Sequence, residues 1–100
     1  KYGEVCITDY IFDECATVLF YRLKDMKKAL MVCETIKKVK IFRVTEGIFE
    51  RAWEIFKNQK AIKLSFTDST IISIMKAEKI ENVATFDEEF KKINDINVIT

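Results

Sequence analysis

Short apolar runs alternate along this sequence with longer segments of helical periodicity, and the alternation limits the fold more than any other feature. Four short β-branched or apolar runs are typical of strands: residues 4–8, 39–44, 82–86 and 97–100. Five segments between them are predicted to be helices: residues 9–23, 25–38, 45–58, 67–79 and 87–93. Because a crossover helix returns the chain to the same end of a sheet, this order predicts an α/β fold with a mainly parallel sheet.

The composition indicates one folded domain over residues 1–100. The 100 residues are 49% hydrophobic and 33% charged, with no proline and two glycines, which excludes collagen-like, mucin-like and disordered classes. No apolar run approaches the roughly 20 residues that span a bilayer, and no signal-peptide pattern is present. We therefore expect a cytoplasmic protein with no membrane partner.

The three cysteines are scattered, and the sequence contains no histidine. A structural zinc ion usually takes four cysteine or histidine ligands, so a zinc site of that kind is excluded. Each cysteine has apolar neighbours and is expected to act as a small buried hydrophobe with a free thiol, which suits a reducing compartment.

Residues 9–23 are apolar on nearly every side, so this helix is expected to be largely buried, with Asp9 as a plausible N-cap. Glu14 lies in the middle of this apolar sequence. An ionised carboxylate there is costly unless it is paired or bound to a metal ion. The alternative for Glu14 is an exposed stripe or a capping role, whereas Asp13 lies on a more polar face and can stay solvated.

Acidic residues recur where predicted strands end and helices begin. Glu14 follows strand 4–8, Asp68 lies in the first turn of helix 67–79, and Asp87 follows strand 82–86. In a parallel sheet these positions share the edge at which α/β folds bind ligands. Carboxylates without histidine or cysteine suit Mg²⁺ or Mn²⁺, which activate water in phosphodiester cleavage.

Each of these acids also has a purely structural interpretation. Asp68 follows Ser65 and Thr67, either of which is a plausible N-cap, and an acid in a first helical turn complements the helix dipole. The same holds for Asp87, since two glutamates follow it in an ordinary N-terminal charge pattern. The convergence of the acids on one edge favours a metal site over three separate caps.

Positive charge is concentrated in residues 22–43. They hold eight basic and two acidic residues, a net charge of +6, so the rest of the chain carries −5. A basic strip beside an acidic pocket suits a nucleic-acid backbone, although a solvated helix face is the alternative. A glycine-rich nucleotide-binding loop is excluded because the two glycines are isolated.

Three acidic motifs resemble those of PIN-domain ribonucleases, most closely single-domain VapC-like toxins. They are TDYIFDE at residues 8–14, SFTDST at 65–70 and ATFDEEF at 84–90. The resemblance extends over essentially the whole chain. It implies a three-layer α/β/α fold with a parallel sheet, and RNA cleavage that depends on Mg²⁺ or Mn²⁺. It also implies three kinds of partner, namely RNA, an antitoxin protein and a second copy in a homodimer.

The resemblance assigns roles to six residues. The metal-site and catalytic acids of the family match Glu14, Asp68 and Asp87. Three hydroxyl residues match positions near the site where they could orient acids or water: Ser65, Thr67 and Thr85.

The sequence departs from the family pattern at its beginning. PIN domains start with a central strand that carries a further metal-binding aspartate, and residues 1–5 do not supply it. We therefore expect an N-terminally incomplete domain, with the missing strand between strands 4–8 and 82–86. Without that aspartate, metal binding and cleavage by the chain alone are expected to be weak or absent.

Two other functions are alternatives to a ribonuclease. A catalytically inactive PIN-like module would bind RNA or a protein partner, with the RNA contacts made by Lys37, Lys38 and Lys40. A phosphoacceptor receiver domain also carries acids at strand ends, but it needs a lysine after the last strand. The sequence has none there, because that strand ends at Thr100.

Overall fold

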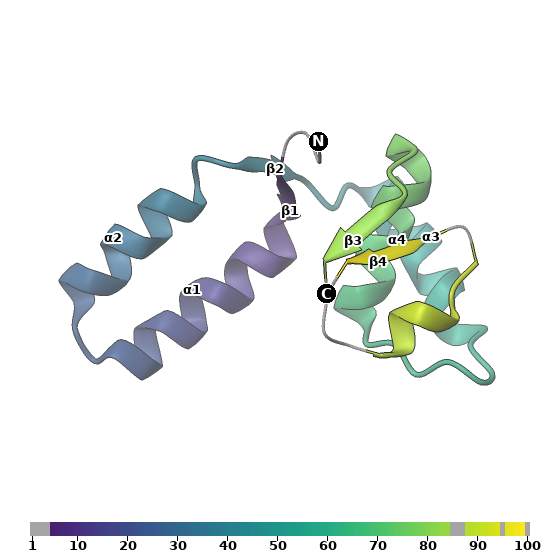
Figure 1. Ribbon diagram of the computed structural model, residues 1–100, viewed down its shortest axis with the longest axis horizontal. Coiled ribbons are helices and arrows are strands. Elements are labelled where there is room, and N and C mark those ends of the chain that lie inside the picture. Colours follow the sequence, from purple (N-terminus) through teal and green to yellow (C-terminus); the bar gives the residue numbers. More distant parts are fainter. Residues whose placement is uncertain (1–4, 85–87, 95, 100) are drawn as a thin grey trace. The chain divides into compact units, whose positions relative to one another are not determined.

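The computed structural model describes residues 5–84, 88–94 and 96–99 (Figure 1). The chain divides into two compact units, Lys1–Val44 and Thr45–Thr100, which we describe separately. Among the described residues, no helix has both the length and the apolarity that crossing a membrane requires.

The first unit is a helical hairpin carried by one parallel pair of strands (Figure 1). Its elements in chain order are β1 (Cys6–Thr8), α1 (Asp9–Leu23), α2 (Met26–Ile36) and β2 (Lys40–Phe42). The strands β1 and β2 pair in parallel with Ile7 opposite Ile41. The strands are shorter than predicted, and α2 ends two residues before Lys38, but each element lies inside its predicted segment.

A local side chain sets the beginning of helix α1. The Thr8 hydroxyl accepts a hydrogen bond from the Ile11 N–H at 3.1 Å and so caps α1. The cap is therefore Thr8 and not Asp9. The Asp9 carboxylate instead accepts from the Val44 N–H at 3.1 Å, which ties the chain beyond β2 to the start of α1.

The prediction that helix 9–23 is largely buried was wrong. No residue of α1 is buried, and Tyr21 is 69% exposed. In α2 only Ala29 is buried. Two helices of a hairpin cover each other only along the strip where they meet, so a segment that is apolar all round keeps most of its apolar surface exposed. The three cysteines are only partly buried, so the prediction of buried thiols was also too strong.

The second unit contains a helix pair and a second parallel pair of strands. Its elements are α3 (Glu46–Lys57), α4 (Phe66–Glu78), β3 (Asn82–Ala84), the 3₁₀-helix η1 (Glu88–Lys92) and β4 (Asn97–Ile99). Helix α3 packs against α4, and β3 pairs with β4 so that Val83 lies opposite Val98. Together with the first unit, this confirms the predicted α/β class with parallel strands.

The core of the second unit gathers around one face of α4. The cluster of buried residues consists of Leu64, Ile72, Met75 and Phe90. Ser73 is also buried, and its hydroxyl donates to the Ile48 carbonyl at 3.1 Å, which joins α4 to α3. Ile72 and Met75 are three positions apart and therefore lie on the same face of the helix.

On α3 the apolar face is wider than its buried part. Ile48 and Ala52 are buried, whereas Phe49, Trp53 and Phe56 remain about 40% exposed. Trp53 and Phe56 stack with ring centroids 6.0 Å apart. The spacing predicts a helix with one broad apolar side, but it does not say how much of that side is covered.

Candidate active site

Asp68 lies at the start of α4 in a reciprocal capping arrangement. The Ser65 hydroxyl accepts from the Asp68 N–H at 3.0 Å, and Asp68 Oδ2 accepts from the Ser65 N–H at 3.3 Å. This capping box satisfies two amides that the first turn of a helix leaves without partners. It also fixes where the Asp68 carboxylate lies. Oδ1 takes no part in the box.

The hydroxyl residues after Ser65 are held by the same helical turn. The Ser69 hydroxyl donates to the Ser65 carbonyl at 3.0 Å, and Thr70 donates to the Thr67 carbonyl. Both Ser69 and Thr70 are fully buried. Ser65 therefore stabilises the start of α4, while a role for Thr67 in orienting acids or water stays a prediction.

Glu14 lies on α1, in the first unit, with an exposed side chain. Its helix contains no buried residue, so the argument that its charge would be costly to bury does not apply. The neighbouring Asp13 is exposed as well. A role for Glu14 in metal binding therefore rests on its motif and not on its surroundings.

Asp87 and Thr85 lie outside the described residues. The chain that follows Asp87 in sequence is anchored, because Phe90 of η1 is 2% exposed and belongs to the core of the second unit.

Glu89 connects η1 to the loop that precedes α4. Its Oε1 accepts from the Lys63 N–H at 2.8 Å, and the Lys92 ammonium pairs with the carboxylate at 3.2 Å. The Lys63 N–H, followed by Lys92, lowers the pKa of Glu89, which therefore stays ionised at neutral pH. The sequence shows Glu89 only as part of an acidic helix start, because its hydrogen-bond partner lies 26 positions away.

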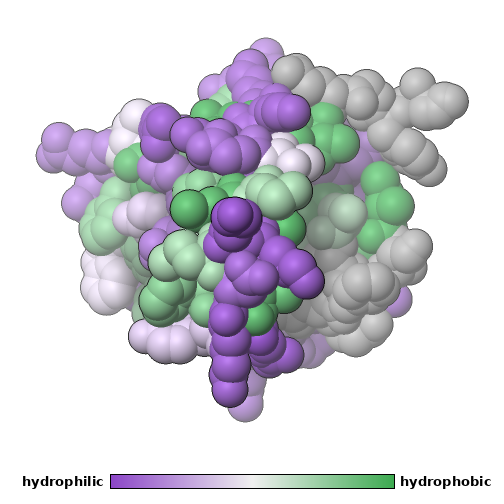
Figure 2. All heavy atoms as spheres, turned by 90° about the vertical axis from the view of Figure 1, so that its left-hand side faces the viewer, coloured by the Kyte–Doolittle hydropathy of each residue, from purple (hydrophilic) through white to green (hydrophobic). Residues whose placement is uncertain are grey.

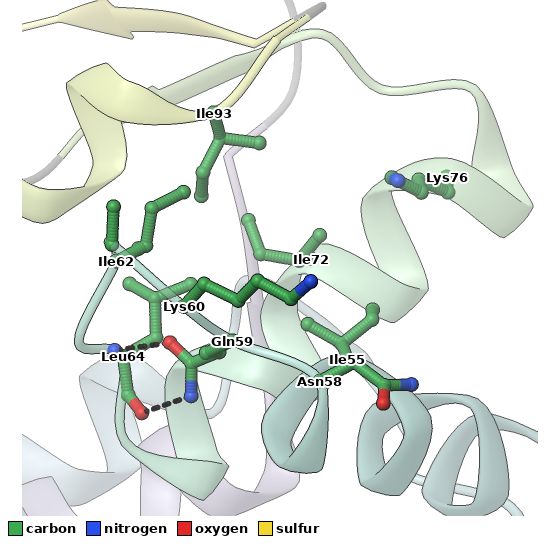
Figure 3. A pocket seen from close by; sticks show the side chains of 10 residues that line it. Ile55, Asn58, Gln59, Lys60, Ile62, Leu64, Ile72, Lys76 and Ile93 are labelled. Carbon is green, nitrogen blue, oxygen red and sulfur yellow. Dashed lines mark hydrogen bonds between the residues drawn. The ribbon is translucent and has the colours of Figure 1, made fainter.

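Gln59 holds the next residue of the same loop. Its Oε1 accepts from the Leu64 N–H at 2.6 Å, and its Nε2 donates to the Leu64 carbonyl at 3.0 Å (Figure 3). Nε2 also donates to the Phe56 carbonyl at 3.1 Å. The residues around these hydrogen bonds line an apolar pocket, and Ile62 and Ile72 are among them. No sequence pattern pointed to Gln59.

The candidate acids have the donor chemistry of a site for a hard cation. Glu14, Asp68 and Asp87 offer carboxylate oxygens, which Mg²⁺ and Mn²⁺ prefer. Within residues 5–84, 88–94 and 96–99, no group of three or more histidine, cysteine, aspartate or glutamate side chains could hold a metal ion. Glu14 and Asp68 belong to different units, so each acid is placed only within its own unit.

Comparison with known proteins gives two agreeing results. The model of the PIN domain family matches residues 1–96. The crystal structure of VapC20 from Mycobacterium tuberculosis, described as a sarcin–ricin loop cleaving toxin, matches with a TM-score of 0.76 and 26% identity. The match covers 92% of this chain and 72% of VapC20. A comparison with curated proteins gives no match. The structural match confirms the predicted α/β/α fold class.

Proposed function

Because the chain belongs to the PIN domain family and is VapC-like, we propose that it is a metal-dependent endoribonuclease and the toxin of a toxin–antitoxin pair. The observation that carries the proposal is the family match over residues 1–96, which includes the motifs of Glu14, Asp68 and Asp87. VapC20, a structural neighbour, is described as a sarcin–ricin loop cleaving toxin. RNA is accordingly the substrate that we propose here.

The proposed roles follow from the chemistry of the side chains. The carboxylates of Glu14, Asp68 and Asp87 would hold Mg²⁺ or Mn²⁺, which supplies an activated water and neutralises phosphate charge when bound. Ser65 fixes the start of the helix that carries Asp68. Thr67 and Thr85 are proposed to orient an acid or a water molecule.

The basic segment 22–43 is the proposed contact for the RNA backbone. Its net charge of +6 attracts phosphates over a range of several ångströms. Lys37, Lys38 and Lys40 are all exposed. Binding by such residues falls steeply as salt rises, because phosphate contacts release counterions.

Metal removal tests the proposed reaction. We expect the full-length protein to cleave single-stranded RNA with Mn²⁺ or Mg²⁺, to lose the activity in EDTA, and to regain it when metal is restored in excess. The measurement is the rate of product formation from end-labelled RNA. Cleavage that persists in EDTA contradicts the metal requirement. RNA binding without cleavage under any of these conditions would instead support the inactive, RNA-binding module.

The exposed apolar side chains of α1 and α2 indicate a protein partner. They form the surface that we call the hairpin surface: Val18, Phe20, Tyr21, Leu23, Met26, Leu30, Met31 and Val32. Figure 2 shows hydrophobic side chains among hydrophilic ones on the side of the molecule where the hairpin ends. Many large apolar side chains exposed on one helical hairpin are typical of an interaction site, and homodimer interfaces are more apolar than transient ones.

We propose a second copy of the chain as the occupant of the hairpin surface, and an antitoxin as a separate partner. Tyr21→Glu is expected to weaken the homodimer at least about tenfold, because it buries an unpaired charge. Asn94→Glu is the control, since it adds the same charge at an exposed position of the second unit, outside the hairpin surface. Sedimentation velocity over a range of protein concentrations measures both.

Salt provides a second readout for the same dimer. Arg22, Lys27 and Lys28 lie among the apolar residues of the hairpin surface, so two copies repel each other electrostatically. Salt screens this repulsion, and the dimer should therefore strengthen as ionic strength rises. A wild-type protein that sediments as a monomer at every concentration and salt level contradicts the homodimer.

A further inference from the structure

We propose that Gln59 and Glu89 are positioning residues that hold the loop 63–65 so that Asp68 presents its carboxylate in one fixed place. The inference rests on the proposed function, in which Asp68 is a metal-site acid. It concerns the chain's own residues, and every contact that carries it lies within the second unit.

Three consecutive backbone amides of this loop donate to side chains from three different parts of the chain. The pairs are Lys63 N–H to Glu89 Oε1 at 2.8 Å, Leu64 N–H to Gln59 Oε1 at 2.6 Å and Ser65 N–H to Asp68 Oδ2 at 3.3 Å. Loop amides ordinarily bond to water or to local turns. Side-chain acceptors on three successive amides leave this segment little freedom to shift.

Gln59 holds the middle residue of the loop through two hydrogen bonds. Its amide group bonds both the N–H and the carbonyl of Leu64, as a neighbouring strand would (Figure 3). The Leu64 side chain is 6% exposed and packs in the core with Ile72. Leu64 therefore cannot move without losing two hydrogen bonds and its apolar contacts. Ser65, the partner of Asp68 in the capping box, is the next residue.

Glu89 fixes the first residue of the loop from a separate element. Its carboxylate bonds the Lys63 N–H and is itself held by Lys92, while Phe90 anchors η1 in the core. Glu89 lies two positions after Asp87 in sequence. The same contact thus joins the loop before Asp68 to the element that directly follows Asp87.

The chemistry of a metal site explains why such a loop would be held so firmly. Catalytic groups must stay within a fraction of an ångström of their working positions, and a misplacement of about 1 Å costs on the order of a hundredfold in rate. The capping box orients Asp68 relative to Ser65 alone. Gln59 and Glu89 extend that constraint to the core and to η1.

The test compares Glu89→Ala with Glu54→Ala. Both variants remove a glutamate that pairs with a lysine three positions later, Lys92 at 3.2 Å and Lys57 at 3.1 Å. Glu89 also accepts the backbone N–H of Lys63, whereas Glu54 accepts the side-chain amide of Asn58 at 3.5 Å. In the full-length protein we expect Glu89→Ala to speed hydrogen exchange of the Lys63 and Asp68 amides at least about fivefold, and Glu54→Ala to leave both unchanged.

Kinetics separate positioning from general stability. Glu89→Ala is expected to lower kcat for RNA cleavage about tenfold with KM unchanged, whereas Glu54→Ala changes neither. Glu89→Gln keeps an oxygen that can accept the Lys63 N–H, so it should restore both the exchange protection and kcat. Gln59→Leu provides an independent variant, because it fills similar space without bonding Leu64, and it should speed exchange at Leu64 and Asp68.

One result overturns the proposal. If exchange of the Asp68 amide and kcat are unchanged in both Glu89→Ala and Gln59→Leu, the loop does not position Asp68. A wild-type protein that cleaves no RNA overturns the proposed function instead. The positioning of Asp68 is then still decided by amide exchange, which needs no activity.

Discussion

Asp68→Asn is expected to reduce metal-dependent RNA cleavage at least about a hundredfold while changing the free energy of unfolding by only about 1 kcal/mol or less. Asparagine keeps an oxygen that can accept the Ser65 N–H, so the capping box survives. What is lost is the negative charge, which a hard cation requires from its ligands. Cleavage rates with Mn²⁺ and urea unfolding of the same preparation measure the two effects.

Ser65→Ala is the matched control for this experiment. It removes the hydroxyl that caps α4 and should cost about 1 kcal/mol of unfolding free energy, yet it leaves the Asp68 carboxylate in place. Its effect on cleavage should be far smaller than that of Asp68→Asn. The opposite pattern, with cleavage retained in Asp68→Asn, would mean that Asp68 is a helix cap and nothing more.

Helix beginnings were predictable from the sequence because capping is local. Ser65 and Thr67 were both candidate caps, and the structure assigns the cap to Ser65, with α4 beginning at Phe66. Thr45 caps α3 in the same way. Where two cap residues are adjacent, the sequence is ambiguous. Thr8 caps α1 and frees Asp9 for a bond to Val44, 35 positions away.

The extent of burial could not be predicted in the same way. The apolar sequence of residues 9–23 predicts a helix that packs against other segments. The local sequence does not reveal which segments these are or how much of the helix they bury. In the described part of the chain α1 meets mainly α2, so side chains such as Phe20 and Tyr21 stay exposed. The argument that placed Glu14 in an apolar environment failed for this reason.

The acids of the candidate site were predicted from motifs, whereas the residues proposed to position the loop before Asp68 were not. Asp68 stands within a recognisable cap pattern, but Gln59 and Glu89 act through hydrogen bonds to loop backbone. Such bonds depend on the path of the loop, and residue type alone does not encode that path. Placement of Asp87 and Thr85 stays a prediction, since both lie outside the described residues.

Glu14→Gln is expected to reduce RNA cleavage at least about a hundredfold and to change the free energy of unfolding by no more than about 0.5 kcal/mol. The small effect on stability follows because Glu14 is exposed on a helix without buried residues. Glutamine keeps the length and shape of the side chain and removes only its charge. Cleavage rates with Mn²⁺ and thermal unfolding are the measurements.

Asp13→Asn is the control that separates a specific role of Glu14 from a general effect of negative charge. Asp13 and Glu14 are adjacent, both exposed, and on the same helix, so the two variants remove the same charge from nearly the same place. Successive residues of an α-helix point about 100° apart, so only one of the two can face a given ion. Equal losses in both variants would indicate a general charge effect on RNA binding. Full activity in Glu14→Gln would remove Glu14 from the metal site and leave that site to the acids of the second unit.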